Sequence, residues 1–319
     1  MNALDPNPLS SSSDRWGVLL LAHGAPDRLS DIPEFLLNVR GGRKLPEKAV
    51  QEIIHRYSLI GGGSPLLRLT QQQARALANR INHPVYMGMR NWKPFIADTV
   101  REMSEAGVER IIALCLAPQN SQTSIGLYRK RLDEAVAEHA PHVAVDFIEN
   151  WHDHPLLIQA FRERGAEAQE RVEREAGGPV PVVFTAHSVP QKTIDDGDPY
   201  ADQVWETARR VAAAMGLEEY RLAFQSQGMT ADPWIGPTVE SQIDELGTSG
   251  ERHVLLVPIG FVSDHVEILY DIDILFREYG ESKGVTVHRS DSLNDSPVFI
   301  QALAEIVSAR IAESPHPHE

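Results

Sequence analysis

Short runs of consecutive apolar residues alternate along the chain with longer stretches in which apolar residues recur every three or four positions. A continuous apolar run predicts a β-strand that is covered on both faces, and a spacing of three to four predicts an amphipathic helix. The strand-like runs are residues 17–24, 84–89, 110–118, 143–149, 181–188, 220–226, 253–261 and 285–291.

The helical stretches fall between these runs, and several begin near Ser, Asp or Pro or end at Gly, as capped helices do. The clearest are residues 65–81, 93–107, 127–140, 154–175, 203–216 and 296–312. Alternation of strands and helices predicts an α/β fold with parallel sheets and right-handed crossovers.

The chain also repeats a short pattern. GVLLLAHGAP and PVVFTAHSVP each give a strand, Ala-His, a small residue, any residue and Pro, which puts His23 and His187 at equivalent positions. We therefore expect two similar Rossmann-like lobes, at residues 14–152 and 153–312, with the ligand site in the cleft between them. The last helix is expected to pack back on the first lobe. Residues 1–13 and 313–319 are expected to be disordered.

The composition of the chain argues against several classes of function. The 319 residues include 30 Lys plus Arg and 45 Asp plus Glu, a net charge of −15 that argues against a nucleic-acid partner. The single cysteine, Cys115, cannot supply the ligands of an iron–sulfur cluster. The polar N-terminus is no signal peptide, and no window approaches the ~20 apolar residues of a membrane span. We expect a cytoplasmic protein.

Two segments carry candidate chemistry. His187 ends a buried strand in TAHSVP, where a histidine packed in the core or a loop is the competing interpretation. In SDHVEILYDID, spacings of three and four predict Asp264, Glu267 and Asp271 on one helical face. A solvated acidic face is the alternative. The position of this row, directly after a buried strand and in the first helical turns, favours a functional role because the helix dipole attracts anions there.

A third segment, QSQGMTADPWIGP, is rich in Gly and Pro and must form a shaped loop. Its Trp234 is either a packing anchor or a wall for a flat ligand.

These segments, together with LLLAHGAP, VRGGRK, RYSLIGGGSPL and GDPYADQVWETA, resemble the ferrochelatases in order and spacing over about residues 15–312. The resemblance implies a lyase of haem biosynthesis that inserts Fe²⁺ into a porphyrin with release of two protons. Fe²⁺ would be a substrate, and no tightly bound cofactor is expected.

The resemblance also implies roles for individual residues. His187 and Glu267 match the family's catalytic and metal-binding pair: a neutral imidazole can accept a proton or bind Fe²⁺, and a carboxylate steadies the positive charge. Asp264 and Asp271 would belong to a path for protons or metal. Leu275 stands where the family often carries a further carboxylate.

His23 occupies a position at which similar bacterial relatives carry Tyr. Three interpretations stay open for it: an axial ligand to the iron of the product, a second contact for the entering metal, or a packed histidine.

The remaining matches concern the porphyrin. Polar groups that would hold it and apolar side chains that would flank it are Arg40, Arg56, Ser64, Tyr128, Arg90, Trp234, Phe261 and Ile32. The basic RGGRK segment, and an N-terminal region with little apolar area for a bilayer, favour the four carboxylates of coproporphyrin III over protoporphyrin IX.

Other functions remain as alternatives: a chelatase for another metal or tetrapyrrole, a non-catalytic porphyrin or haem carrier and, most weakly, a hydrolase using Ser188 with His187. The expected partners are the porphyrin substrate and haem product, with an iron donor or a downstream haem enzyme. We expect a monomer.

Overall fold

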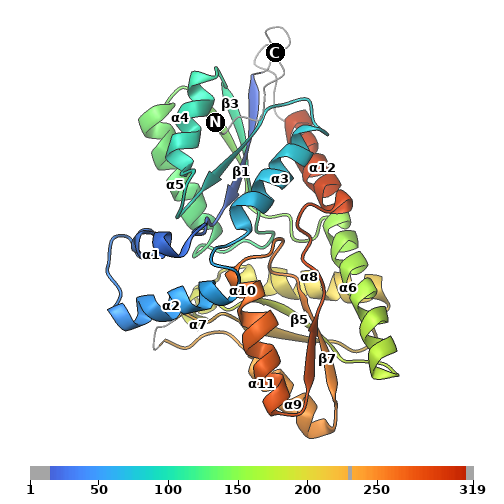
Figure 1. The fold of residues 1–319 in the computed structure, drawn as a ribbon. Coiled ribbons are helices and arrows are strands. Elements are labelled where there is room, and N and C mark those ends of the chain that lie inside the picture. The colour runs from blue at the N-terminus through green and yellow to red at the C-terminus, as the bar shows by residue number, and fades with distance from the viewer. Residues whose placement is uncertain (1–14, 229–231, 314–319) are drawn as a thin grey trace.

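The computed structural model describes residues 15–228 and 232–313. In these residues a strand forms at each of the predicted apolar runs. The first sheet has the order β2-β1-β3-β4, and the second has the order β6-β5-β7-β8. All pairings are parallel, and Figure 1 shows one sheet above the other. The strands are β1 (Trp16–Ala22), β2 (Val85–Met89), β3 (Arg110–Cys115), β4 (Ala144–Ile148), β5 (Val182–His187), β6 (Arg221–Gln225), β7 (His253–Pro258) and β8 (Thr286–Arg289).

The two sheets share one topology. In each, the first strand of the sequence is central, the second pairs on one side of it, and the third pairs on the other. The chain therefore changes direction beside β1 and beside β5, and such switch points are where α/β sheets bind ligands. This confirms the predicted α/β fold with two similar lobes.

Helices cover both faces of each sheet. On the first sheet, α4 (Ile96–Glu105) and α5 (Ile125–His139) share one core cluster with the strands, and α3 (Leu66–Ala78) lies on the other face. On the second sheet, α6 (Pro155–Ala176) and α8 (Tyr200–Met215) face α9 (Val239–Ser249) and α11 (Arg277–Ser282) across the strands.

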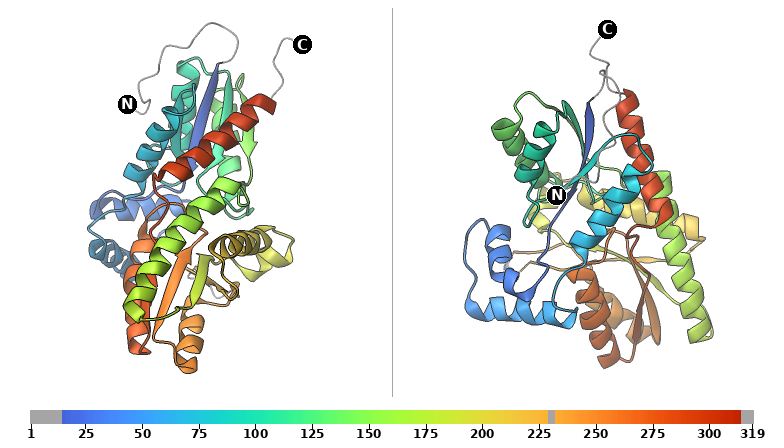
Figure 2. Two further views of the ribbon diagram at one scale, coloured as in Figure 1. Left: turned by 90° about the vertical axis from the view of Figure 1, so that its right-hand side faces the viewer. Right: turned by 45° about the horizontal axis from the view of Figure 1, so that its top comes forward.

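The last helix, α12 (Pro297–Glu313), joins the two halves. It packs against α3 and α6, as Figure 2 shows, and the Phe299 ring stacks on Trp151 with centroids 6.0 Å apart. One apolar cluster therefore runs from Val18 of the first sheet to Val257 of the second. The boundary at residues 152 and 153 falls between β4 and α6 and stays a prediction.

Short helices that the apolar pattern did not indicate follow the central strands. After β1 come the 3-10 turn η1 (Leu29–Asp31), α1 (Ile32–Val39) and α2 (Glu47–Leu59), and after β5 comes α7 (Gln191–Asp195). In Figure 1, α1 and α2 project to one side at the level between the two sheets.

The acidic segment differs from the single helix that its spacing predicts. It forms α10 (Val266–Leu269), then a π-helical turn η2 (Asp271–Phe276), and then α11. His265 before α10 is extended, with φ −160° and ψ −174°. Asp264 therefore lies outside the helix, and the predicted row of three carboxylates on one face was wrong. Single π turns of this kind are frequent at functional sites.

The prediction that residues 313–319 are disordered was wrong at Glu313, which is the last residue of α12; its remainder, like the prediction for residues 1–13, lies outside the described residues. Within residues 15–228 and 232–313, no helix has both the length and the apolar composition that crossing a bilayer requires.

Candidate active site

His187 and Glu267 meet where the second sheet ends. Nε2 of His187, the last residue of β5, lies 3.6 Å from Oε2 of Glu267 in α10, and the two side chains are 36% and 33% exposed. Nδ1 of His187 bonds the carbonyl oxygen of Ser188. Because a carbonyl oxygen only accepts, Nδ1 carries a hydrogen, and Nε2 is the ring nitrogen that faces the carboxylate.

A second imidazole approaches the same oxygen. Nε2 of His265 lies 3.7 Å from Oε2 of Glu267, and Nδ1 of His265 donates to the carbonyl of Ser263 at 2.9 Å. The Nε2 atoms of two imidazoles thus converge on one carboxylate oxygen. Sequence reasoning missed His265, although it lies in the same DHVE segment as Glu267.

Charge in this cluster favours a bound cation. Partial burial opposes ionisation of Glu267, but the positive charges of His187 and His265 outweigh it and lower the Glu267 pKa to about 2. For His265, burial disfavours protonation, yet the hydrogen bond and charge of Glu267 raise its pKa above the ordinary value. At neutral pH the carboxylate is ionised, and a proton or metal ion between it and the rings is stabilised.

The first lobe contributes His23, which follows β1. Nδ1 of His23 donates to the carbonyl of Gly24 at 2.9 Å, so its Nε2 accepts from the Asn91 side-chain amide at 3.0 Å. Gly24 has φ +80°, and a Cβ there would lie 2.8 Å from the backbone nitrogen of Trp92. The turn that aims His23 therefore needs glycine.

His23 is neutral at physiological pH. The ring is partly exposed, but the protein around it removes much of its hydration, and together with the Arg90 charge this lowers its pKa to about 4. Glu267 acts in the opposite direction on the same pKa, which couples the two lobes electrostatically. Burial raises the pKa of Tyr57 and Tyr128 in the first lobe, and the charge of Glu267 adds to this effect.

Arg90 and Tyr128, both predicted for the porphyrin site, contact each other. The guanidinium carbon of Arg90 lies 4.6 Å from the centroid of the Tyr128 ring, and Nη1 donates to the Ser124 carbonyl at 3.2 Å. This stacking holds a fixed positive charge near His23.

Two arginines that the sequence predicts at the porphyrin site each have a side-chain N–H without a hydrogen-bond partner among the described residues. Nε of Arg40, at the end of α1, and Nε of Arg56, in the last turn of α2, are buried and have no hydrogen-bond partner among the described residues. Arg56 also lies over the Tyr270 ring at 5.3 Å and pairs with Glu52. The Ser64 hydroxyl, by contrast, accepts from the Leu66 backbone nitrogen at 3.3 Å.

Asp271 and Asp264, the two residues predicted to form a path for protons or metal, lie in different surroundings. Asp271 accepts from Ser226, and burial, with the charge of Glu267, raises its pKa to about 6. The positive charge of Arg56 lowers the same pKa. Asp271 therefore interacts electrostatically both with Glu267 and with Arg56.

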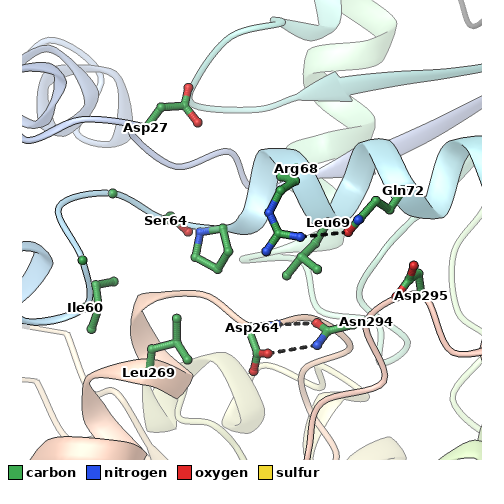
Figure 3. Close-up of a pocket in the computed structure, with 13 residues that line it drawn as sticks. Asp27, Ile60, Ser64, Arg68, Leu69, Gln72, Asp264, Leu269, Asn294 and Asp295 are labelled. Carbon is green, nitrogen blue, oxygen red and sulfur yellow. Dashed lines mark hydrogen bonds between the residues drawn. The ribbon is translucent and has the colours of Figure 1, made fainter.

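Asp264 turns away from the centre. Its carboxylate accepts from Ser292 at 2.7 Å, Asn294 at 2.9 Å and Arg289 at 3.5 Å. It borders a cavity of about 690 Å³ between the start of α3 and α10, drawn in Figure 3. Of the predicted residues, the cavity lining includes Ser64 and Asp264 but neither His187 nor Glu267.

The apolar candidates also differ in placement. Phe261 packs beside the centre, with ring centroids 6.4 Å from His187 and 5.0 Å from His265. Trp234 forms a β-bridge with Pro190, just after His187. Ile32 is fully buried in α1 and offers no surface to a ligand. Leu275, in the π turn, is 40% exposed.

Comparison with known proteins identifies the family. The Ferrochelatase family model matches residues 15–311. A ferrochelatase of Acidobacterium capsulatum is 47% identical, covering 95% of this chain and 98% of its own length. A coproporphyrin III ferrochelatase of Geobacillus thermodenitrificans is 35% identical, covering 95% and 98%.

Among solved structures, SirB of Bacillus subtilis with Fe³⁺ has a TM-score of 0.58 at 13% identity, covering 92% of this chain and 94% of its own. That likeness concerns the fold alone. The family model and the relatives, together with the paired His187 and Glu267, lead to one conclusion: the chain belongs to the ferrochelatase family, the lyases that insert iron into porphyrins.

Proposed function

We propose that this ferrochelatase inserts Fe²⁺ into coproporphyrin III, with His187, His265 and Glu267 as the centre that accepts protons and faces the metal. The observation that carries the proposal is the approach of two imidazole Nε2 atoms, at 3.6 and 3.7 Å, to one ionised carboxylate oxygen. Fe²⁺ is a substrate here, and nitrogen and oxygen donors suit its brief residence.

The reaction exchanges two pyrrole protons for one Fe²⁺. Nε2 of His187 takes a proton from the macrocycle, and Glu267 stabilises the imidazolium that forms. Asp271, with a pKa of about 6, can take up and release the protons near neutral pH. The iron then bonds the pyrrole nitrogens that the protons have left.

His23 supplies a second nitrogen from the first lobe. It is neutral, so its Nε2 lone pair can bind the iron of the product once the hydrogen bond from Asn91 breaks. A neutral ligand adds no charge that would repel the entering cation.

Four carboxylates on the substrate fit the cations around this centre. The Nε donors of Arg40 and Arg56, which have no partner among the described residues, are groups that a carboxylate would satisfy, and Arg43 and Lys44 are exposed shortly after Arg40 in the chain. The name of the Geobacillus relative, coproporphyrin III ferrochelatase, supports the same substrate.

The test is anaerobic Fe²⁺ insertion followed by absorbance, with coproporphyrin III and protoporphyrin IX side by side. We expect a higher kcat/KM with coproporphyrin III, and a larger rise in KM for that substrate in Arg40→Gln and Arg56→Gln. Arg131→Gln is the matched control, because Arg131 is an exposed arginine that pairs with Glu134 on α5.

A preference for protoporphyrin IX would refute coproporphyrin III as the substrate but would still agree with ferrochelatase activity. Binding of both porphyrins without insertion into either would instead favour a porphyrin carrier.

A further inference from the structure

Three potential metal ligands meet at the other end of the second sheet. They are Glu175 in the last turn of α6, His253 at the start of β7 and His288 in β8. One ligand atom from each lies within 4.8 Å of the others, and Nδ1 of His253 is 3.1 Å from Nε2 of His288. Among the described residues, this group alone combines three such side chains so closely.

The fold brings these residues together through strand register. His253 pairs with Thr286 and His288 with Leu255, so both histidines project from the same face of the sheet. That face is the one that α6 covers, since Leu255 shares a core cluster with Leu157 and Val172. Glu175 arrives above the two histidines as α6 ends.

The geometry suits a tetrahedral ion. Two nitrogens bound to one Zn²⁺ at about 2.0–2.1 Å are roughly 3.3 Å apart, close to the 3.1 Å that separates these ring nitrogens. Two imidazoles and a carboxylate are a common donor set for such ions. The two rings stack with centroids 5.3 Å apart and planes 22° apart, and their nitrogens share a hydrogen bond, so both rings must rotate and give up that hydrogen for their lone pairs to meet at one ion.

Accessibility and charge also permit binding. The histidines are half-buried and Glu175 is exposed, which leaves a route for an ion and its water. Arg171 and Arg277 are nearby, but Arg171 donates to the Arg289 carbonyl and Arg277 pairs with Asp273.

We propose that Glu175, His253 and His288 form a second metal site, for a divalent ion of the Zn²⁺ class. It is separate from the iron centre, because His253 opens β7 whereas Glu267 comes after the other end of this six-residue strand, which is about 16 Å long at 3.3 Å per residue. A bound ion would fasten the end of α6 to the edge strand β8.

The probe is Co²⁺, whose visible absorption reports ligation, with Zn²⁺ as competitor. The parent protein carries His187→Ala and Glu267→Gln, so that the iron centre does not compete, and His316→Asn with His318→Asn, which removes the terminal histidines. We expect one Co²⁺ per chain, displaced by Zn²⁺, and binding at least about ten-fold weaker in His253→Gln or His288→Gln.

His142→Gln is the control, because His142 is an exposed histidine outside the cluster. Glu175→Gln, on the helix surface, covers the case in which a strand variant fails to fold. It should reduce the rise in Tm that Zn²⁺ produces. Unchanged Co²⁺ affinity in the cluster variants, or no stoichiometric binding by the parent, would overturn the proposal. Fe²⁺ insertion by His253→Gln in the native background should match the wild type, which separates this test from that of the active centre.

Discussion

The side-chain amide of Asn91 donates to Nε2 of His23 at 3.0 Å, while the other ring nitrogen of His23 donates to Gly24. The lone pair that would bind iron is therefore held by a hydrogen bond in the free enzyme. Asn91 is 7% exposed, so water replaces this donor poorly. On the proposal that His23 binds the iron of the product, Asn91 should set how readily the first lobe can do so.

Replacing Asn91 with Ala should tighten product binding. A hydrogen bond that need not be broken is worth about 0.5–1.5 kcal/mol, or roughly 2- to 12-fold in affinity. Titration of the iron porphyrin into the variant measures this change. In a His23→Ala background, Asn91→Ala should have no effect; an equal effect there would show that Asn91 does not act through His23.

The acidic limb of the pH profile, where the rate of Fe²⁺ insertion falls as the pH is lowered, should depend on Ser226. Asp271 has a pKa of about 6, and the hydrogen bond from Ser226 lowers that pKa. Ser226→Gly removes the hydroxyl and tolerates the residue's φ of 59°, so the midpoint of the limb should move to higher pH. A pH profile of kcat/KM that is identical in both proteins would contradict a role for Asp271 in proton transfer.

The pH dependence of the free energy of unfolding provides an independent measure of the pKa of Asp271. The folded pKa of Asp271 lies above its ordinary value of 3.8, so the folded state binds the proton more tightly than the unfolded state. The resulting stabilisation is fully present below about pH 4 and is lost as pH rises through about 6. Asp271→Asn should remove this component from the pH dependence of the free energy of unfolding, as urea denaturation would show.

Asp264 should matter for stability more than for insertion. Its carboxylate joins Arg289, which is 11% exposed, to Ser292 and Asn294. Asp264→Asn should lower the free energy of unfolding by about 1–3 kcal/mol and leave kcat of the folded protein nearly unchanged. A large loss of kcat at full stability would return Asp264 to the path that the sequence suggested.

The sequence predicted the sheets well because six of the described strands are mostly apolar and almost wholly buried, whereas the edge strands β4 and β8 are more polar and only partly buried. Position at the carboxyl edge of the second sheet made His187 and Glu267 candidates and the family resemblance paired them; the structure brings the two side chains together, and their catalytic role stays a prediction. Sequence reasoning failed at Asp264, whose partners lie 25 to 30 residues later in the chain. It also missed His265, because residues two apart do not share a helical face. The extended backbone at His265 brings the two side chains together.

His265 should affect the rate through the charge of Glu267. His265→Gln keeps a polar side chain but cannot carry a proton, so the pKa of Glu267 should rise and insertion should slow by about 10-fold or more. Steady-state rates from pH 6 to 8 test this. His253→Gln, at the other end of the sheet, is the control, and equal rates in the two variants would show that His265 takes no part.

The most direct measurement is single-turnover Fe²⁺ insertion by His187→Ala under anaerobic conditions, with porphyrin affinity measured separately by fluorescence quenching. The proton acceptor at 3.6 Å from Glu267 is then gone while the binding residues remain. Insertion should fall by about 10²- to 10⁴-fold with porphyrin affinity largely unchanged. Near-normal insertion by this variant would contradict the assignment of His187 as the group that accepts the pyrrole proton.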